Sequence, residues 1–288
     1  MRSTRGVVFF LSVLALLASG AHAQVFIRIT APPPPLPVYV QPVIPGPDFM
    51  WCPGYWAWGE FGYFWVPGTW VRAPGPGLLW TPGYWAWNDG IYVWRAGYWG
   101  PRVGFYGGVN YGYGYTGIGY QGGYWRDRVF VYNSAVTRLG SVQITNVYSK
   151  TVINNTTVTN VSYNGGPSGL KVQATAQEQA AAQDKHLPAT ALQTQHQDGA
   201  SKNQALLASV NHGKPSIAAT AKAAEFSGHG GVAARGITGA QPQTKLHAAV
   251  AGKKDGRGEG TKFANAPAHK QAPRNARNPQ HHDKKHNP

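Results

Sequence analysis

Residues 51–70, WCPGYWAWGEFGYFWVPGTW, and residues 80–99, WTPGYWAWNDGIYVWRAGYW, are two copies of one pattern, and this pattern decides the fold. Aligned without a gap, the two stretches are identical at eleven of twenty positions. Ten of the eleven tryptophans in the chain lie within them. Similarity at a fixed spacing is typical of a duplicated supersecondary unit.

Each copy has the pattern of a β-hairpin, with aromatic residues on both sides of a short polar loop. Loops at 59–62 and 88–91 would pair aromatic residues across each hairpin: Trp58 with Tyr63, Trp56 with Trp65, Trp87 with Tyr92, and Trp85 with Trp94. Because side chains alternate along a strand, these rings share one face of each hairpin. A lone hairpin is marginal in water, so we expect both to join one small antiparallel sheet. The Pro-Gly steps should bend or end the strands.

The segments YFWVPGTW (63–70) and YVWRAGYW (92–99) resemble the YXWGXW (WXXGXW) repeat of a family of exported bacterial envelope proteins. The proline-rich lead-in APPPPLPVYV is also similar to that of the family. Many members are small exported proteins or lipoproteins whose biochemical role is largely unassigned. The resemblance therefore implies a location and an architecture rather than an activity.

The first 23 residues are typical of a secretory signal peptide. Arg2 and Arg5 precede an apolar run at 6–17, and an Ala-x-Ala pattern predicts cleavage between Ala23 and Gln24. The alternative is an uncleaved anchor, for which the run is short. No cysteine follows the run as a site for a lipid. We therefore expect an exported chain, periplasmic or outer-envelope associated, that is not lipid-anchored and has no membrane span after signal removal.

The remaining chain divides by composition into a proline-rich spacer (24–49), the tandem repeat hairpins (50–100), a Gly/Tyr-rich segment (101–127), a Val/Thr/Asn β-rich segment (128–165) and a basic low-complexity tail (166–288). The prolines predict an extended spacer, with a role as ligand of an aromatic groove as the alternative. The Gly/Tyr-rich segment predicts irregular β structure packed on the repeats. The next segment predicts two to four short strands.

The tail contains only two aromatic residues, Phe226 and Phe263. Such a segment lacks the apolar surface that would offset its ordering entropy. We expect it to be mostly disordered, with short helices at 172–184 and around 203–211. The expected fold class is therefore mainly β: a small antiparallel sheet from the Trp-rich hairpins, further short strands, and a long disordered tail.

Net charge indicates the class of partner. The formal charge is +15, and the tail holds sixteen Lys/Arg against seven Asp/Glu. A basic tail is attracted to anionic surfaces by a field that salt screens. For an exported protein these surfaces are peptidoglycan, lipopolysaccharide or another anionic envelope component, and we expect no nucleic-acid partner. The alternative is that the charge only maintains solubility. Oligomeric state is left open.

Residue placement argues against catalysis. Residues 37–165 contain no histidine and one cysteine, Cys52, which excludes a Ser-His-Asp or Cys-His arrangement and a His/Cys zinc site there. Glu60 and Asp89 are equivalent in the two repeats and could form a glycosidase carboxylate pair, but both occupy turns where polar residues are common. We predict no catalytic residue, no cofactor and no metal. A cell-wall-acting hydrolase or carbohydrate-active protein is the alternative.

The paired aromatic residues are the candidate binding site, because aromatic faces stack on sugar rings or other apolar partners. This candidate ligand platform comprises Trp56, Trp58, Tyr63, Trp65, Trp85, Trp87, Tyr92 and Trp94. We favour the alternative in which the same rings form the hydrophobic core, since large aromatic side chains dominate core energetics. The predicted function is a non-enzymatic, exported cell-envelope protein with a structural or binding role.

Overall fold

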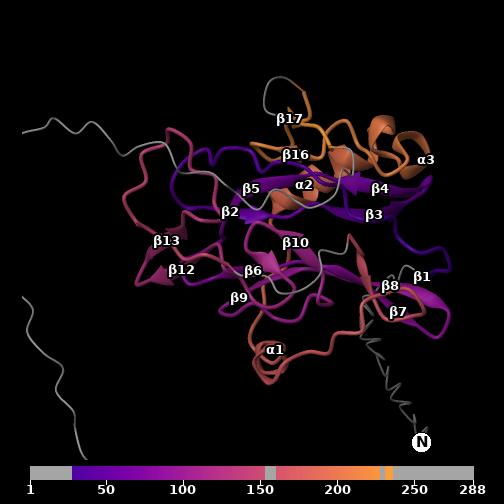
Figure 1. Ribbon diagram of the computed structural model, residues 1–288, viewed down its shortest axis with the longest axis horizontal. Helices are drawn as coiled ribbons and strands as arrows, with labels where there is room; N and C mark the ends of the chain where they lie inside the picture. The colour runs from indigo at the N-terminus through magenta and orange to yellow at the C-terminus, as the bar shows by residue number, and fades with distance from the viewer. Residues whose placement is uncertain (1–27, 153–159, 228–230, 236–288) are drawn as a thin grey trace, which may run out of the picture. The chain divides into compact units, whose positions relative to one another are not determined.

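The computed structural model describes residues 28–152, 160–227 and 231–235, which form a mainly β structure built from several small sheets (Figure 1). The predicted signal peptide with its cleavage site at Ala23 and Gln24 lies outside the described residues, as does the tail after residue 235. Among the described residues, no helix has the length and apolar character needed to cross a membrane.

The first repeat folds into a long hairpin whose two arms are each interrupted at a proline. Its strands are β2 (Phe49–Cys52), β3 (Tyr55–Gly59), β4 (Gly62–Val66) and β5 (Gly68–Arg72). Strand β3 pairs with β4 and β2 with β5, both antiparallel. Trp56 lies opposite Trp65, and Trp58 opposite Tyr63. The predicted register and the predicted interruption at Pro-Gly are both confirmed.

The second repeat has the same plan. Its strands are β6 (Leu79–Thr81), β7 (Tyr84–Asn88), β8 (Ile91–Arg95) and β9 (Tyr98–Gly100). Strand β7 pairs with β8 and β6 with β9. Trp85 lies opposite Trp94 and Trp87 opposite Tyr92, as predicted.

The two hairpins do not join into one sheet, so that prediction is wrong. Strands β3 and β4 form a two-stranded sheet, whereas β7 and β8 belong to a four-stranded sheet with β1 (Arg28–Ile29) and β15 (Tyr163–Asn164). The hairpins instead meet through their rings: Tyr55 stacks on Trp94 with centroids 5.0 Å apart, and Tyr63 contacts Trp85 edge-on at 5.6 Å. Removing the aromatic faces from water stabilises the fold. Face-to-face packing of the two hairpins buries more of this surface than joining their edges in one sheet would.

The next two segments largely follow the sequence prediction. The Gly/Tyr-rich segment contains β10 (Asn110–Gly112), β11 (Tyr115–Thr116) and β12 (Gly123–Arg126). The segment 128–165 contains three strands, β13 (Val129–Asn133), β14 (Val147–Tyr148) and β15. Its residues 153–159 lie outside the described part. Tyr111 and Tyr115 are buried, but Tyr113 has a positive φ of 52° in the turn between β10 and β11. The tyrosines therefore do not alternate along one extended strand.

Ordered structure continues well beyond residue 165, which corrects the prediction that disorder begins there. This region contains α1 (Ala176–Ala181), α2 (Ala191–Ser201), η1 (Gln204–Leu206), α3 (Ala208–Asn211), β16 (Ala219–Thr220) and β17 (Gly231–Val232). The helices expected near 172–184 and 203–211 are present, whereas α2 was not predicted. Helix α2 packs against β4, and β16 pairs in parallel with β5. The aromatic hairpins thus supply the apolar contacts that the segment lacks by itself.

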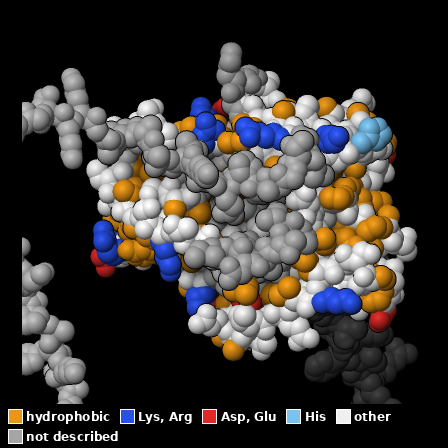
Figure 2. Space-filling model, viewed as in Figure 1, with side chains coloured by type: hydrophobic (Ala, Val, Ile, Leu, Met, Phe, Trp, Pro, Cys, Tyr) orange, Lys and Arg blue, Asp and Glu red, His pale blue; other side chains and the backbone are white. Residues whose placement is uncertain are grey.

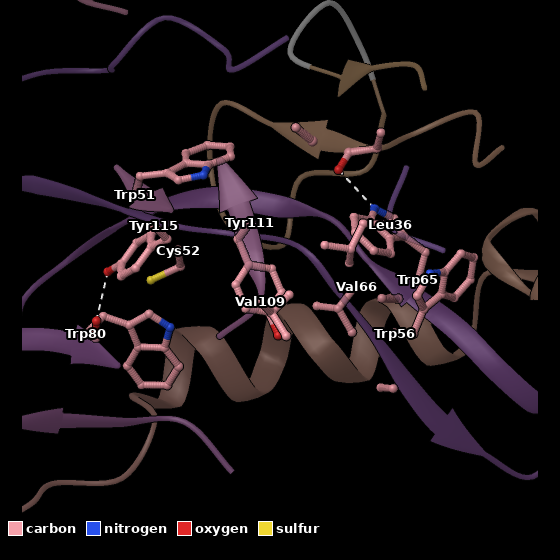
Figure 3. Close-up of a cluster of buried hydrophobic side chains, with 14 of the residues drawn as sticks. Leu36, Trp51, Cys52, Trp56, Trp65, Val66, Trp80, Val109, Tyr111 and Tyr115 are labelled. Atoms are coloured by element: carbon pink, nitrogen blue, oxygen red, sulfur yellow. Dashed lines mark hydrogen bonds between the residues drawn. The ribbon is translucent and has the colours of Figure 1, made fainter. Parts of the chain in front are cut away.

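The proline-rich segment is not a free spacer, which corrects a third prediction. Leu36, Tyr39 and Ile44 are buried at 7%, 8% and 1% exposure. Leu36 belongs to the same buried cluster as Trp56 and Trp65 (Figure 3). The segment therefore lies within the folded domain and contributes side chains to its core.

Candidate functional site

The glycines of each repeat mark a point where the two arms of the hairpin cross closely. A Cβ atom on Gly54 would lie 2.7 Å from the backbone nitrogen of Gly68 and 2.4 Å from Cζ2 of Trp65. A Cβ atom on Gly68 would lie 3.0 Å from the nitrogen of Gly54 and 2.6 Å from Cζ2 of Trp51. The tryptophan of one arm therefore covers the glycine of the other arm.

The second repeat reproduces this crossing. A Cβ atom on Gly83 would lie 2.5 Å from Cζ2 of Trp94, and one on Gly97 would lie 2.6 Å from Cζ2 of Trp80. Each would also lie 2.8 Å from the nitrogen of the opposite glycine. The spacing Trp-x-x-Gly-x-Trp thus has a physical cause, because only glycine lets the arms approach and leaves room for an indole ring.

Most of the predicted ligand platform is internal. Five of its eight residues are buried, with exposures of 7% or less: Trp56, Tyr63, Trp65, Trp85 and Tyr92. The other three, Trp58, Trp87 and Trp94, are partly buried. A buried ring cannot offer its face to a sugar. Of the eight predicted ligand-binding residues, only these three remain candidates. Trp58 and Trp94 line a hollow of only about 30 Å³.

Four of the buried indoles donate their N–H groups to backbone carbonyls of this same chain, whereas Trp99 donates to the side chain of Gln193 and Trp51 Nε1 has no partner among the described residues. Trp65 Nε1 donates to the carbonyl oxygen of Ala218 at 2.9 Å (Figure 3), and Trp85 Nε1 donates to that of Trp56 at 2.8 Å. A buried indole N–H needs such a partner, because leaving it unpaired costs free energy. These bonds fix the rings in place and join the two hairpins and β16.

Residues 31–45, hereafter the lead segment, lie against a row of donor side chains that bond to their carbonyl groups. Trp56 Nε1 donates to the carbonyl oxygen of Pro35 at 3.0 Å, and Trp70 Nε1 donates to that of Pro42 at 3.1 Å. Three hydroxyl groups donate to further carbonyls of the segment: Tyr63 to Ala31, Tyr113 to Tyr39, and Ser162 to Pro34. Proline lacks a backbone N–H, so a proline-rich segment offers mainly acceptors. We call these five donor residues, four of which are aromatic, the aromatic groove.

A cavity of about 110 Å³ lies between the two repeats and α2. Cys52, Tyr111, Gln193 and His196 are among its lining residues. Figure 3 shows Cys52 and Tyr111 near α2 within the buried cluster. The presence of His196 corrects the prediction that the folded part contains no histidine.

His196 and Cys52 are held in neutral, structural states. His196 Nε2 donates to the carbonyl oxygen of Pro67 at 2.8 Å, while its Nδ1 accepts from the backbone N–H of Ala224 at 2.8 Å. Both ring nitrogens are therefore engaged, and burial lowers the pKa of the imidazole. Burial also raises the pKa of the Cys52 thiol, whose Sγ accepts a bond from Gln193. Neither group is poised as a base or nucleophile.

Glu60 and Asp89 occupy the loops that close the two hairpins, where their side chains are exposed. Asp89 has a positive φ of 45°, a conformation that Asp tolerates better than most residues. Both positions fit the turn role that the sequence indicates. Among the described residues, no cluster of three His, Cys, Asp or Glu side chains could hold a metal ion.

The sequence contains a signal for helix α2, the part of the site that was not predicted. Thr190 caps α2 by accepting from the N–H of Gln193, whose side chain accepts from the N–H of Thr190. This Thr-x-x-Gln capping box is a recognisable helix start. It would have placed α2, and with it Gln193 and His196, among the ordered elements.

Comparison with known proteins identifies the repeat. A family model for the WXXGXW repeat matches the chain in two copies, at residues 46–71 and 75–99. No curated protein and no solved structure matches the chain. The matched residues are those of the two crossed hairpins, so the family pattern and the crossing geometry describe the same feature.

Proposed function

We propose that this WXXGXW-repeat protein is a non-enzymatic, exported component of the bacterial cell envelope. In this proposal the aromatic domain is a rigid scaffold, and the basic charge attaches it to an anionic envelope surface. The observation that carries the proposal is the internal use of the tryptophans: Trp56, Trp65, Trp70 and Trp85 are buried and donate their N–H groups within the chain. Charge is then the main means of attachment.

The distribution of charge supports this mode of attachment. After residue 235 the sequence carries ten Lys/Arg and three Asp/Glu. Among the described residues, the ion pairs are Arg102 with Asp184 at 2.8 Å and Lys222 with Glu225 at 3.6 Å. Figure 2 shows further Lys and Arg side chains spread over one face, with fewer acidic ones. The field of such a chain attracts peptidoglycan carboxylates or lipopolysaccharide phosphates and weakens as salt increases.

Two features of the described part support the non-enzymatic half of the proposal. Cys52 is a buried thiol with a raised pKa, and both ring nitrogens of His196 are bonded to backbone groups. The candidate carboxylates Glu60 and Asp89 each occupy an exposed turn. Export and envelope location rest on the signal-peptide pattern of residues 1–23 and on the family resemblance.

Cosedimentation tests the proposal. Residues 24–288 are mixed with purified sacculi, and separately with outer-membrane vesicles, at low and high salt. One variant replaces the ten Lys/Arg after residue 235 by Gln, and a matched control exchanges Lys and Arg at the same positions. We expect low-salt pelleting of the wild type and the control, and its loss at high salt or in the Gln variant. Salt-resistant pelleting of the Gln variant would contradict attachment by charge.

The same incubation tests the hydrolase alternative. Soluble muropeptides released from the sacculi are measured over time, and the non-enzymatic proposal predicts no release above that of sacculi alone. Release that depends on Glu60 or Asp89 would contradict it.

A further inference from the structure

The lead segment is held in the manner of a bound peptide. Its main contacts are side-chain donors on its carbonyls, supplemented by three isolated backbone bonds: Leu36 N–H to Asn160 at 2.7 Å, Ile44 N–H to Arg138 at 2.9 Å, and Arg235 N–H to Val38 at 2.6 Å. Its anchors are the buried side chains of Leu36, Tyr39 and Ile44. The prolines restrict φ and so reduce the entropy lost on docking. Recognition of this kind depends on the chemistry of the segment and not on its being covalently joined to the groove.

A short turn joins the lead segment to the first repeat. The segment ends at residue 45, β2 begins at Phe49, and the chain turns at 46–48. Asp48 in this turn has a φ of 66°. Aspartate tolerates this left-handed conformation better than most residues with a Cβ, but less well than glycine, so the side chain at position 48 sets how readily the segment folds back. An extended conformation at 46–48 would not need a left-handed residue at this position.

Before the lead segment, the described chain contains only β1, which pairs with β8 through two residues. The lead segment leads directly into the turn at 46–48, hereafter the hinge, and itself contains no strand or helix. An arm of residues 28–45 that moves away breaks the β1–β8 pairing and its bonds to Asn160, Arg138 and Arg235, while the hairpins keep their internal pairing.

We propose that the aromatic groove binds the lead segment of a second copy of this chain, so that two copies exchange arms reciprocally. The exchanged state repeats every donor and acceptor pair of the groove, because the arm that enters is identical to the arm that leaves. Only the hinge changes its conformation. Exchange of an identical element is a low-cost route to a dimer. The inference does not depend on envelope binding.

The hinge supplies a test that alters neither the groove nor the arm. Valine is branched at Cβ and is poorly accommodated at positive φ, so Asp48→Val should disfavour the folded-back state. Glycine adopts positive φ readily, so Asp48→Gly should favour it. For valine, the left-handed penalty corresponds to a shift of roughly ten-fold per hinge in the equilibrium between folded-back and exchanged arms.

The experiment uses residues 24–288 in three forms: wild type, Asp48→Val and Asp48→Gly. Light scattering after size exclusion gives the dimer fraction over a range of concentrations, and copurification of two differently tagged copies gives exchange between chains. We expect the dimer fraction to increase in the order Asp48→Gly, wild type, Asp48→Val. A synthetic peptide of residues 28–45 in excess should convert dimers to monomers, because it occupies the same groove.

Three results would overturn the proposal. The first is a monomer in all three forms at every concentration. The second is a dimer whose population is independent of the hinge variant. The third is a dimer that the peptide leaves intact, since that dimer would use another surface. The peptide experiment on the wild type keeps the test decisive even where Asp48→Val does not fold.

Discussion

Replacement of Gly54 by alanine should be among the most damaging small changes in the chain. The new Cβ would lie 2.4 Å from Trp65 Cζ2, 2.7 Å from Gly68 N and 2.8 Å from Val66 O. Carbon contacts are favourable at about 3.5–4.0 Å, so all three distances are repulsive. Two of the three atoms belong to the backbone of the other arm, so a rotated side chain cannot relieve the clash. The arms must separate at their crossing point.

The expected loss follows from two opposing terms. Overpacking costs roughly 1–3 kcal/mol, and contacts with fixed backbone place Gly54→Ala at the upper end of that range. Alanine also lowers the conformational entropy of the unfolded chain, which stabilises the folded state by about 0.4–1 kcal/mol. The net destabilisation is therefore about 2 kcal/mol, a substantial fraction of the roughly 5–15 kcal/mol that stabilises a typical domain.

Urea unfolding followed by tryptophan fluorescence measures this loss. With a slope of about 1–3 kcal/mol per molar urea, the midpoint should fall by about 0.7–2 M. Gly75→Ala is the matched control, because its Cβ would find Leu78 Cδ1 at an ordinary 3.7 Å. The control should unfold at the wild-type midpoint or slightly above it. Equal midpoints for the two variants would refute the crossing as the reason for glycine in the repeat.

Three further predictions concern single side chains. Trp56→Phe should cost about 1–3 kcal/mol more than Trp58→Phe in the same urea assay, because it leaves the carbonyl oxygen of Pro35 without its donor; equal costs would contradict this. Because the pKa of His196 is lowered in the folded chain, its imidazole is protonated more readily in the unfolded chain as the pH decreases below about 6.5. The free energy of unfolding should therefore fall as the pH decreases through and below about 6.5, and fall less in His196→Gln; parallel profiles would exclude the histidine as the cause. Cys52 should react with a thiol reagent far more slowly in the native chain than in urea, and comparable rates would contradict its burial and raised pKa.

The sequence predicted the features that depend on local pattern. The register of Trp56 with Trp65 and of Trp85 with Trp94 follows from loop length and two-residue alternation within one hairpin. The duplication allowed each repeat to support the prediction for the other. The strands in segment 128–165 were likewise indicated by their β-branched residues.

The features that were missed depend on contacts between distant segments. Docking of the lead segment requires Trp56, Trp70 and Ser162 to meet carbonyls that lie far away in sequence. The order of residues 166–227 requires the aromatic hairpins as a surface, because the segment has few large apolar side chains of its own. Composition describes a segment in isolation, so it predicted a spacer at 24–49 and disorder from residue 166 where the structure, up to residue 235, has docked elements.

For the candidate ligand platform, too, the sequence predicted the local pattern but not the contacts between distant segments. Pattern placed the eight rings on hairpin faces, but whether those faces were open or covered depended on how the two hairpins meet. The stacking of Tyr55 on Trp94 and the edge contact of Tyr63 with Trp85 cover them. The rings that were candidates for ligand binding therefore serve mainly as core.

The most direct test of this account is the exposure of the tryptophans in solution. Fluorescence emission and acrylamide quenching are measured for residues 24–288, folded and in urea. Since Trp51, Trp56, Trp65, Trp70, Trp85 and Trp99 are buried at 2% exposure or less, the folded chain should emit at shorter wavelength and show a several-fold lower quenching constant than the unfolded chain. Red-shifted emission with quenching close to that in urea would mean an open aromatic face, and would contradict the closed core.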